Sequence, residues 1–147
     1  MKTRKKNKLV TDIFFSILVV SGILLATSCA RKVNFLSSSV VPAAKGSVKV
    51  KQDNNSNYMI KVKIQDLAAV ERLQSFKQTY VVWMETDKGE IENVGQLKSS
   101  RSIFSKQKTA FLETVSSYKP VRIFVTAENG IDVRTPSNQI IMTTDNF

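Results

Sequence analysis

The sequence predicts an all-β protein, an antiparallel β-sandwich of seven or eight strands with an immunoglobulin-like architecture. Short segments of alternating apolar and polar residues recur over residues 46–147, and residues that favour turns separate them. One connection, residues 65–77, is the only segment with helical spacing of its apolar residues. Many short strands with almost no helix are typical of two sheets packed face to face.

The first 28 residues are predicted to be an export signal. Basic residues at positions 2, 4, 5, 6 and 8 precede an apolar run over residues 13–26. Small residues then lead to Cys29, which is the only cysteine of the chain. A basic region, a short apolar run and a small-residue exit are typical of secreted bacterial proteins. The run is shorter than the ~20 residues that a transmembrane helix needs.

The segment that ends at Cys29 resembles the lipobox of bacterial lipoproteins, with leucine at position 25 and alanine at position 26, where the family usually has leucine. The resemblance implies cleavage before Cys29 and attachment of lipid, including a palmitate-type chain, to that residue. An uncleaved membrane anchor and a plain secreted protein are the alternatives. Ala30, in place of aspartate, suggests sorting to the outer membrane, where we expect the domain to face the periplasm.

Cleavage before Cys29 leaves 147 − 28 = 119 residues, enough for one domain with its own core. Five of the 22 basic residues and one of the 12 acidic residues lie in the signal, so the net charge becomes 17 − 11 = +6. A moderately basic envelope protein is suited to contact anionic lipid headgroups or an acidic polymer. Nucleic acid is not expected as a partner, because the chain has no recognition motif. We expect a monomer.

Residues 29–45 are predicted to be the lipidated cysteine and a tether. Serines, alanines and a proline mix there with scattered apolar residues, and no period is evident. Docking of part of this segment as an edge strand is the alternative. The folded domain is then expected to comprise residues 46–147.

The elements of the domain follow in order from local pattern. Residues 47–51 and 58–64 both alternate, and the asparagine-rich segment 53–57 between them favours a turn, so a hairpin is predicted. Asp66 is a candidate N-cap for one or two helical turns in the connection that follows.

The second half of the domain continues with strands. Residues 80–84 are a continuous apolar run, typical of a strand buried on both faces, and Trp83 within it is expected between the two sheets. Further strands are predicted over residues 90–97, 103–104, 111–112, 121–127 and 139–143, separated by turns at 87–89, 106–108 and 129–130.

Several of these elements together resemble the C-terminal, extracytoplasmic domain of anti-sigma-K factors. They are Tyr80-Val81-Val82-Trp83, Asn93-Val94-Gly95-Gln96-Leu97, Arg122-Ile123-Phe124-Val125-Thr126-Ala127-Glu128 and Pro136. The resemblance covers Tyr80 to about Ile141, and it implies a β fold outside the cytoplasm. It does not imply anti-sigma activity, because only a dozen residues precede the apolar run, where those factors carry their sigma-binding region.

The residue inventory argues against an enzyme. The chain has no histidine, its cysteine is predicted to be acylated, and its five glycines form no phosphate-binding loop. Four carboxylates over positions 85–92 could in principle hold Ca²⁺ or act as an acid–base pair. The alternation of Glu90 and Glu92 around Ile91 favours a solvated strand face instead. No catalytic residue, metal site or cofactor is predicted.

Two classes of function are compatible with this pattern. The first is a structural or protein-interaction module of the cell envelope, which presents loops or an edge strand to an unknown envelope partner. The second is a small-ligand-binding or sensor domain that serves an envelope signalling system. Functional residues concentrate on loops, and the candidate interaction residues are Arg72, Leu73, Ile131 and Arg134. The alternative is that these two loops only close the sandwich.

Overall fold

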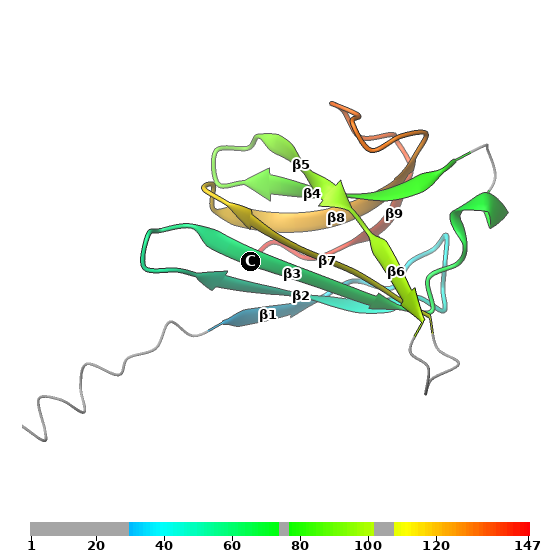
Figure 1. The fold of residues 1–147 in the computed structure, drawn as a ribbon, viewed down its shortest axis with the longest axis horizontal. Coiled ribbons are helices and arrows are strands. Elements are labelled where there is room, and N and C mark those ends of the chain that lie inside the picture. The colour runs from blue at the N-terminus through cyan, green and yellow to red at the C-terminus, as the bar shows by residue number, and fades with distance from the viewer. Residues whose placement is uncertain (1–29, 74–76, 102–107) are drawn as a thin grey trace, which may run out of the picture.

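Figure 1 shows the protein as a computed structural model, in which residues 30–73, 77–101 and 108–147 are described. The predicted signal peptide, the lipidation site Cys29 and residues 102–107 lie outside the described residues. The strands are β1 (Arg31–Asn34), β2 (Lys45–Gln52), β3 (Tyr58–Gln65), β4 (Thr79–Thr86), β5 (Ile91–Gln96), β6 (Lys98–Arg101), β7 (Lys108–Ser116), β8 (Pro120–Glu128) and β9 (Ile140–Thr143), with one 3₁₀ helix, η1 (Val70–Arg72).

Two antiparallel sheets pack face to face, which confirms the predicted β-sandwich (Figure 1). The five-stranded sheet has the order β1-β2-β3-β7-β6, and the four-stranded sheet has the order β5-β4-β8-β9. Leaving β1 aside, these orders are those of strands A-B-E-D and C′-C-F-G in immunoglobulin-like domains. The chain crosses between the sheets after β3, β5 and β7, as it does in that architecture.

Alternation decides which side chains enter the core. Ile60, Val62 and Ile64 are buried on β3, whereas Lys61 and Lys63 between them are exposed, as the pattern predicts. The four-stranded sheet contributes the other half of this core. Its buried members include Val82 and Met84 of β4, Ile123 and Val125 of β8, and Met142 of β9. Because the chain has one cysteine, this apolar packing holds the two sheets together without a disulfide.

The structure differs from the predicted tether over residues 29–45. Arg31–Asn34 pairs with β2 over its whole length, and Phe35 then forms a bridge with Thr144 beside the four-stranded sheet. Val41 and Ala44 are buried in the main core. The predicted boundary at residue 46 therefore omits a strand and part of the core. The composition of residues 30–45 resembles a linker because the segment passes from one sheet to the other. Its apolar residues therefore do not alternate as they do along a single strand.

Trp83 is fully buried, but it does not lie between the sheets as expected. The side chains of Tyr80, Val82 and Met84 occupy the inner face of β4, so Trp83 is on its outer face. There it stacks on Phe124 with ring centroids 6.4 Å apart and packs with Val81 and Val133. A second, smaller core thus covers the outside of the four-stranded sheet.

The connection after β3 contains less helix than the spacing predicted. The 3₁₀ helix η1 is three residues long, its N-cap is Ala69, and no side chain caps it. Asp66 instead adopts a φ of 55° where the chain turns away from β3. A β-conformation at the N-cap and C-cap prevents extension of the helix, so this connection is mostly irregular.

The two ends of the sandwich differ. One end, called the turn end, carries the tight turns at residues 53–57, 87–90 and 117–119. The other end, called the loop end, carries residues 66–78 and 129–139, because β3 and β8 end there and β4 and β9 begin there. Arg31 lies opposite Val50 and thus near the turn end, where the described chain begins (Figure 1).

Candidate functional site

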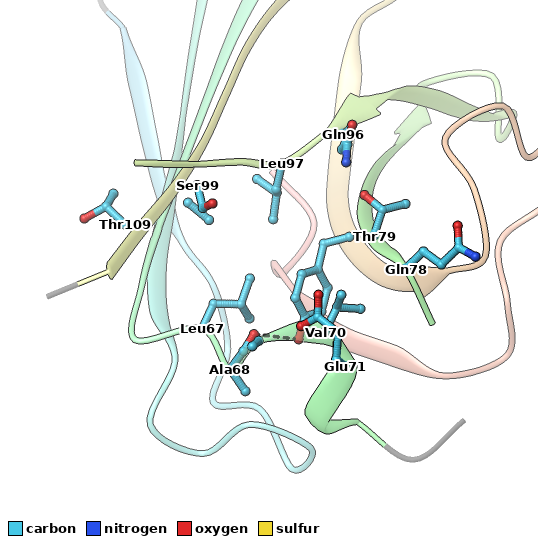
Figure 2. Close-up of a pocket in the computed structure, with 13 residues that line it drawn as sticks. Leu67, Ala68, Val70, Glu71, Gln78, Thr79, Gln96, Leu97, Ser99 and Thr109 are labelled. Carbon is cyan, nitrogen blue, oxygen red and sulfur yellow. Dashed lines mark hydrogen bonds between the residues drawn. The ribbon is translucent and has the colours of Figure 1, made fainter. Parts of the chain in front are cut away.

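A cavity of about 320 Å³ opens at the loop end, where the two sheets and the connection after β3 meet (Figure 2). Its walls come from η1 and the residues before it, the start of β4, the step from β5 to β6, and the start of β7. It is lined by Leu67, Ala68, Ala69, Val70, Glu71, Gln78, Thr79, Tyr80, Gln96, Leu97, Ser99, Thr109 and Ala110.

The lining combines an apolar surface with several polar groups. Leu67, Val70 and Leu97 supply apolar contacts, whereas Gln96 and Thr109 offer hydrogen-bonding groups. Small-molecule sites in proteins span about 300–1,000 Å³ and place a few polar groups among apolar ones. The cavity lies at the lower end of that range. It can take a small polar molecule or a single side chain of a protein partner.

Thr79 carries an unusual hydroxyl at this site. The residue is 6% exposed, and its Oγ1 has no hydrogen-bond partner among the described residues. A buried polar atom without a partner costs about 1–3 kcal/mol, so such atoms are rare in folded proteins. By the alternation along β4, Thr79 shares the outer face of the strand with Val81 and Trp83, whereas Tyr80 faces the space between the sheets. The unpartnered hydroxyl is therefore enclosed beside the second core and does not face the cavity.

Tyr80 connects the cavity wall to the core. It is 8% exposed, and its hydroxyl donates a hydrogen bond to the carbonyl oxygen of Ala68 at 3.1 Å, which ties the connection to β4. Burial, and secondarily the negative charge of Glu71, raises the pKa of the Tyr80 hydroxyl from 10.0 to about 12. Tyr80 therefore keeps its proton at neutral pH and acts there as a hydrogen-bond donor.

This raised pKa predicts a loss of stability in alkali. Below pH 10 the phenol is neutral in both states; above it the unfolded chain ionises first, because the folded pKa of Tyr80 is about 12. Stability that is present below pH 10 is then lost as the pH rises to 12, by about 3 kcal/mol. Chemical denaturation at a series of pH values measures this loss.

Tyr80→Phe is the matched variant for this measurement. It should lose about 1 kcal/mol at neutral pH with the hydrogen bond, and its stability should fall less steeply between pH 10 and 12. Tyr118→Phe, at a residue that is 40% exposed, is the control and should retain the wild-type slope. Equal slopes in the wild type and Tyr80→Phe would contradict the assignment.

The predicted interaction residues lie in two separate places. Arg72 is exposed at the end of η1, directly after the cavity-lining Glu71, and Leu73 is half-buried against the main core. Ile131 is 50% exposed and Arg134 is exposed, both in the loop between β8 and β9. Both loops leave the sandwich at the loop end, but they are anchored to different parts of it.

The loop over residues 129–139 folds back over the outer face of the four-stranded sheet. The side-chain amide of Asn93 donates hydrogen bonds to the carbonyl oxygens of Ile131 and Val133, both at 2.9 Å. Glu128 is 5% exposed, and its Oε1 accepts hydrogen bonds from Thr126 Oγ1 at 2.6 Å and from the Ser137 amide at 2.8 Å. These contacts hold the loop over the second core.

The carboxylates between positions 85 and 92 do not assemble into a site. Glu85 pairs with Arg122 across β4 and β8, with Oε2 2.8 Å from the guanidinium nitrogen. Asp87 and Glu90 are exposed in the turn, and Glu92 is on β5. In the described part of the chain no group of three or more histidine, cysteine, aspartate or glutamate side chains could hold a metal ion.

The sequence predicts part of the cavity wall. Five lining residues, Leu67 to Glu71, lie in the connection over residues 66–77, one of the two loops expected to make contacts. The lining residues Tyr80 and Gln96 belong to strands and are not predicted by an expectation that rests on loops. A cavity also depends on how far apart two sheets stand at one end, which no local pattern encodes.

Comparison with protein-family models, with curated proteins and with solved structures finds no match to this chain. The segments that resemble the anti-sigma-K extracytoplasmic domain all lie in or next to the four-stranded sheet, on β4, β5, β8 and the loop before β9. Over the described residues, no helix has the length and apolar character needed to cross a membrane.

Proposed function

We propose that this protein is a lipid-anchored module of the cell envelope, held by Cys29 on the periplasmic face of the outer membrane, that captures a protein partner through its loop end. The observation that carries the proposal is the position of the cavity relative to the anchor. Arg31, two residues after Cys29, lies near the turn end, whereas the cavity lies at the loop end. Eight-residue strands such as β2 separate these ends by about 25 Å.

The chemistry of the cavity favours binding without catalytic turnover. Its ionisable side chains are Glu71 and Tyr80, and a tyrosine with a pKa of about 12 keeps its proton near neutral pH. General acid–base catalysis needs groups whose pKa values lie near the working pH. A side chain of the partner that enters the cavity would contact both its apolar wall and its polar groups.

A small-ligand sensor, accessory to an envelope signalling system, is the second candidate. The mixed lining of the cavity favours it, because small-molecule sites place a few polar groups among apolar ones. The resemblance of the strands to an anti-sigma extracytoplasmic domain supports the same reading. In this case the exposed loops would surround the ligand in the cavity and would not contact a protein partner.

Charge reversal on the two loops tests the first candidate. Arg72→Glu and Arg134→Glu should each reduce capture of the partner in a crosslinking pull-down from intact cells, because exposed charges steer association. Both residues are exposed, so the melting temperature should stay within a few degrees of the wild type. Lys88→Glu at the turn end is the matched control and should leave capture unchanged. Capture that survives both arginine changes would place the interface elsewhere.

Tyr80→Phe also separates the two candidates. The substitution removes the hydroxyl at the cavity wall and keeps the ring, so the domain should remain folded at a cost of about 1 kcal/mol. A ligand that raises the melting temperature of the wild type, and not that of Tyr80→Phe, would favour the sensor. Partner capture that is unchanged in Tyr80→Phe and lost in Arg72→Glu would favour the protein-interaction module.

A further inference from the structure

One face of the five-stranded sheet is covered by lysines. Alternate residues of β1, β2 and β3 point away from the core, and six of them form what we call the lysine face: Lys32, Lys45, Lys49, Lys51, Lys61 and Lys63. All six are exposed, and these three strands contain no acidic residue. Among the described residues, one of the six has an ion pair, which joins Lys61 to Glu113 of β7 at 2.7 Å.

The strand register places like charges side by side. Lys49 lies directly opposite Lys32 on one side and Lys61 on the other. Like charges in directly opposed positions destabilise a sheet. Lysines do protect exposed sheet edges from pairing with other chains, but β2 and β3 are interior strands of this sheet. Neither stability nor edge protection accounts for the arrangement, which instead fits an external anionic surface.

We propose that the lysine face lies against the anionic lipid headgroups of the membrane that holds the protein. The proposal rests on the lipid anchor of the proposed function. Because β1 pairs with β2 from Arg31 onward, one residue separates Cys29 from the folded sheet, and a lipid on Cys29 would hold the domain at the headgroups. β1 is the edge strand of the sheet, and its Lys32 belongs to the lysine face.

The shape and chemistry of the face favour a membrane over a defined ligand. Lysine ammonium groups are compact charges on flexible stems, which suit diffuse headgroups better than they suit a fixed partner geometry. On the same face of β7, Phe111 and Val115 are 42% and 59% exposed, so apolar side chains accompany the charges. A protein that lies on this face leaves the cavity at the loop end open along the membrane plane.

Lysine footprinting on vesicles tests this orientation. The full-chain protein is reconstituted on vesicles of phosphatidylcholine alone or mixed with phosphatidylglycerol, and a membrane-impermeant acylating reagent is followed by mass spectrometry. Lys49 and Lys63 should react several-fold more slowly on the anionic vesicles, and high salt should reverse this protection. Lys88 and Lys119, exposed at the turn end, are internal controls and should react equally on both.

A double variant provides the second arm. Lys49→Gln with Lys63→Gln should abolish most of the protection of Lys32 on anionic vesicles, whereas Lys88→Gln with Lys119→Gln should retain it. Equal reactivity of the lysine face on both vesicles would overturn the proposal. Protection by soluble polyglutamate but not by anionic vesicles would also overturn it, in favour of an acidic polymer. Flotation with neutral vesicles reports the anchor separately, so failure of the anchor and failure of the lysine face are distinguishable.

Discussion

Replacing Trp83 with alanine is expected to lower the free energy of unfolding by about 3–5 kcal/mol. The side chain is fully buried, stacks on Phe124, and donates a hydrogen bond from Nε1 to Thr126 Oγ1 at 2.7 Å. Its removal leaves a large cavity in a small second core and leaves Thr126 without that donor. Domains of this size have a total stability of about 5–15 kcal/mol, so the loss is a large share of it.

Chemical denaturation measures the effect of this substitution. Trp83→Phe is the matched control: it keeps most of the apolar volume and loses the hydrogen bond, so it should cost clearly less than the alanine variant. The intrinsic fluorescence of the wild type offers an independent check, because a buried indole emits at shorter wavelength than one in water. A native spectrum typical of a water-exposed tryptophan would show the second core to be wrong.

The sequence does not predict which face of β4 carries Trp83. A continuous apolar run predicts a strand that is buried on both faces, and β4 is buried on both faces. The apolar run does not show which face of β4 turns toward the five-stranded sheet, because both faces are apolar. That choice is decided by Tyr80, Val82 and Met84, which meet the five-stranded sheet, and by the loop over residues 129–139, which covers the remaining face.

Strands with one solvent-exposed face are easier to predict. On β3 the lysines alternate with isoleucine and valine, so the inner face and the hairpin with β2 both follow from the pattern. The turn between them also follows, because the Asp53 carboxylate accepts hydrogen bonds from the amides of Asn55 and Asn57, both at 2.8 Å. These backbone hydrogen bonds favour the ionised carboxylate and hold the pKa of Asp53 below its usual value.

Contacts between distant segments were not predictable in this way. The segment after β1 is held by the amide of Leu36, which donates to the carbonyl of Thr143, and by the hydroxyl of Ser38, which donates to the carbonyl of Ile141. Both partners lie more than 100 residues further along the chain. No alternation within the segment indicates contacts with residues so far along the chain. Without those contacts the sequence predicts a tether.

The absence of a tether changes what the predicted lipid would do. A long tether would let the domain sample many orientations above the membrane, so the position of individual lysines would matter little. With one residue between Cys29 and β1, the lipid and the lysine face would act on the same small region of membrane. Two such signals bind a membrane far more stably than one acyl chain does.

Cys29→Ser is expected to abolish lipid attachment, and with it stable retention in the membrane fraction. A serine hydroxyl cannot replace the thiol that the predicted lipobox requires for acylation, so the variant should accumulate as an unprocessed precursor without palmitate label. Ser28→Ala, the adjacent small-residue change, is the matched control and should still be processed. Metabolic labelling with palmitate, together with mass spectrometry of the mature N-terminus, measures both outcomes. An unmodified Cys29 in the mature wild-type protein would refute the anchor on which the proposed function rests.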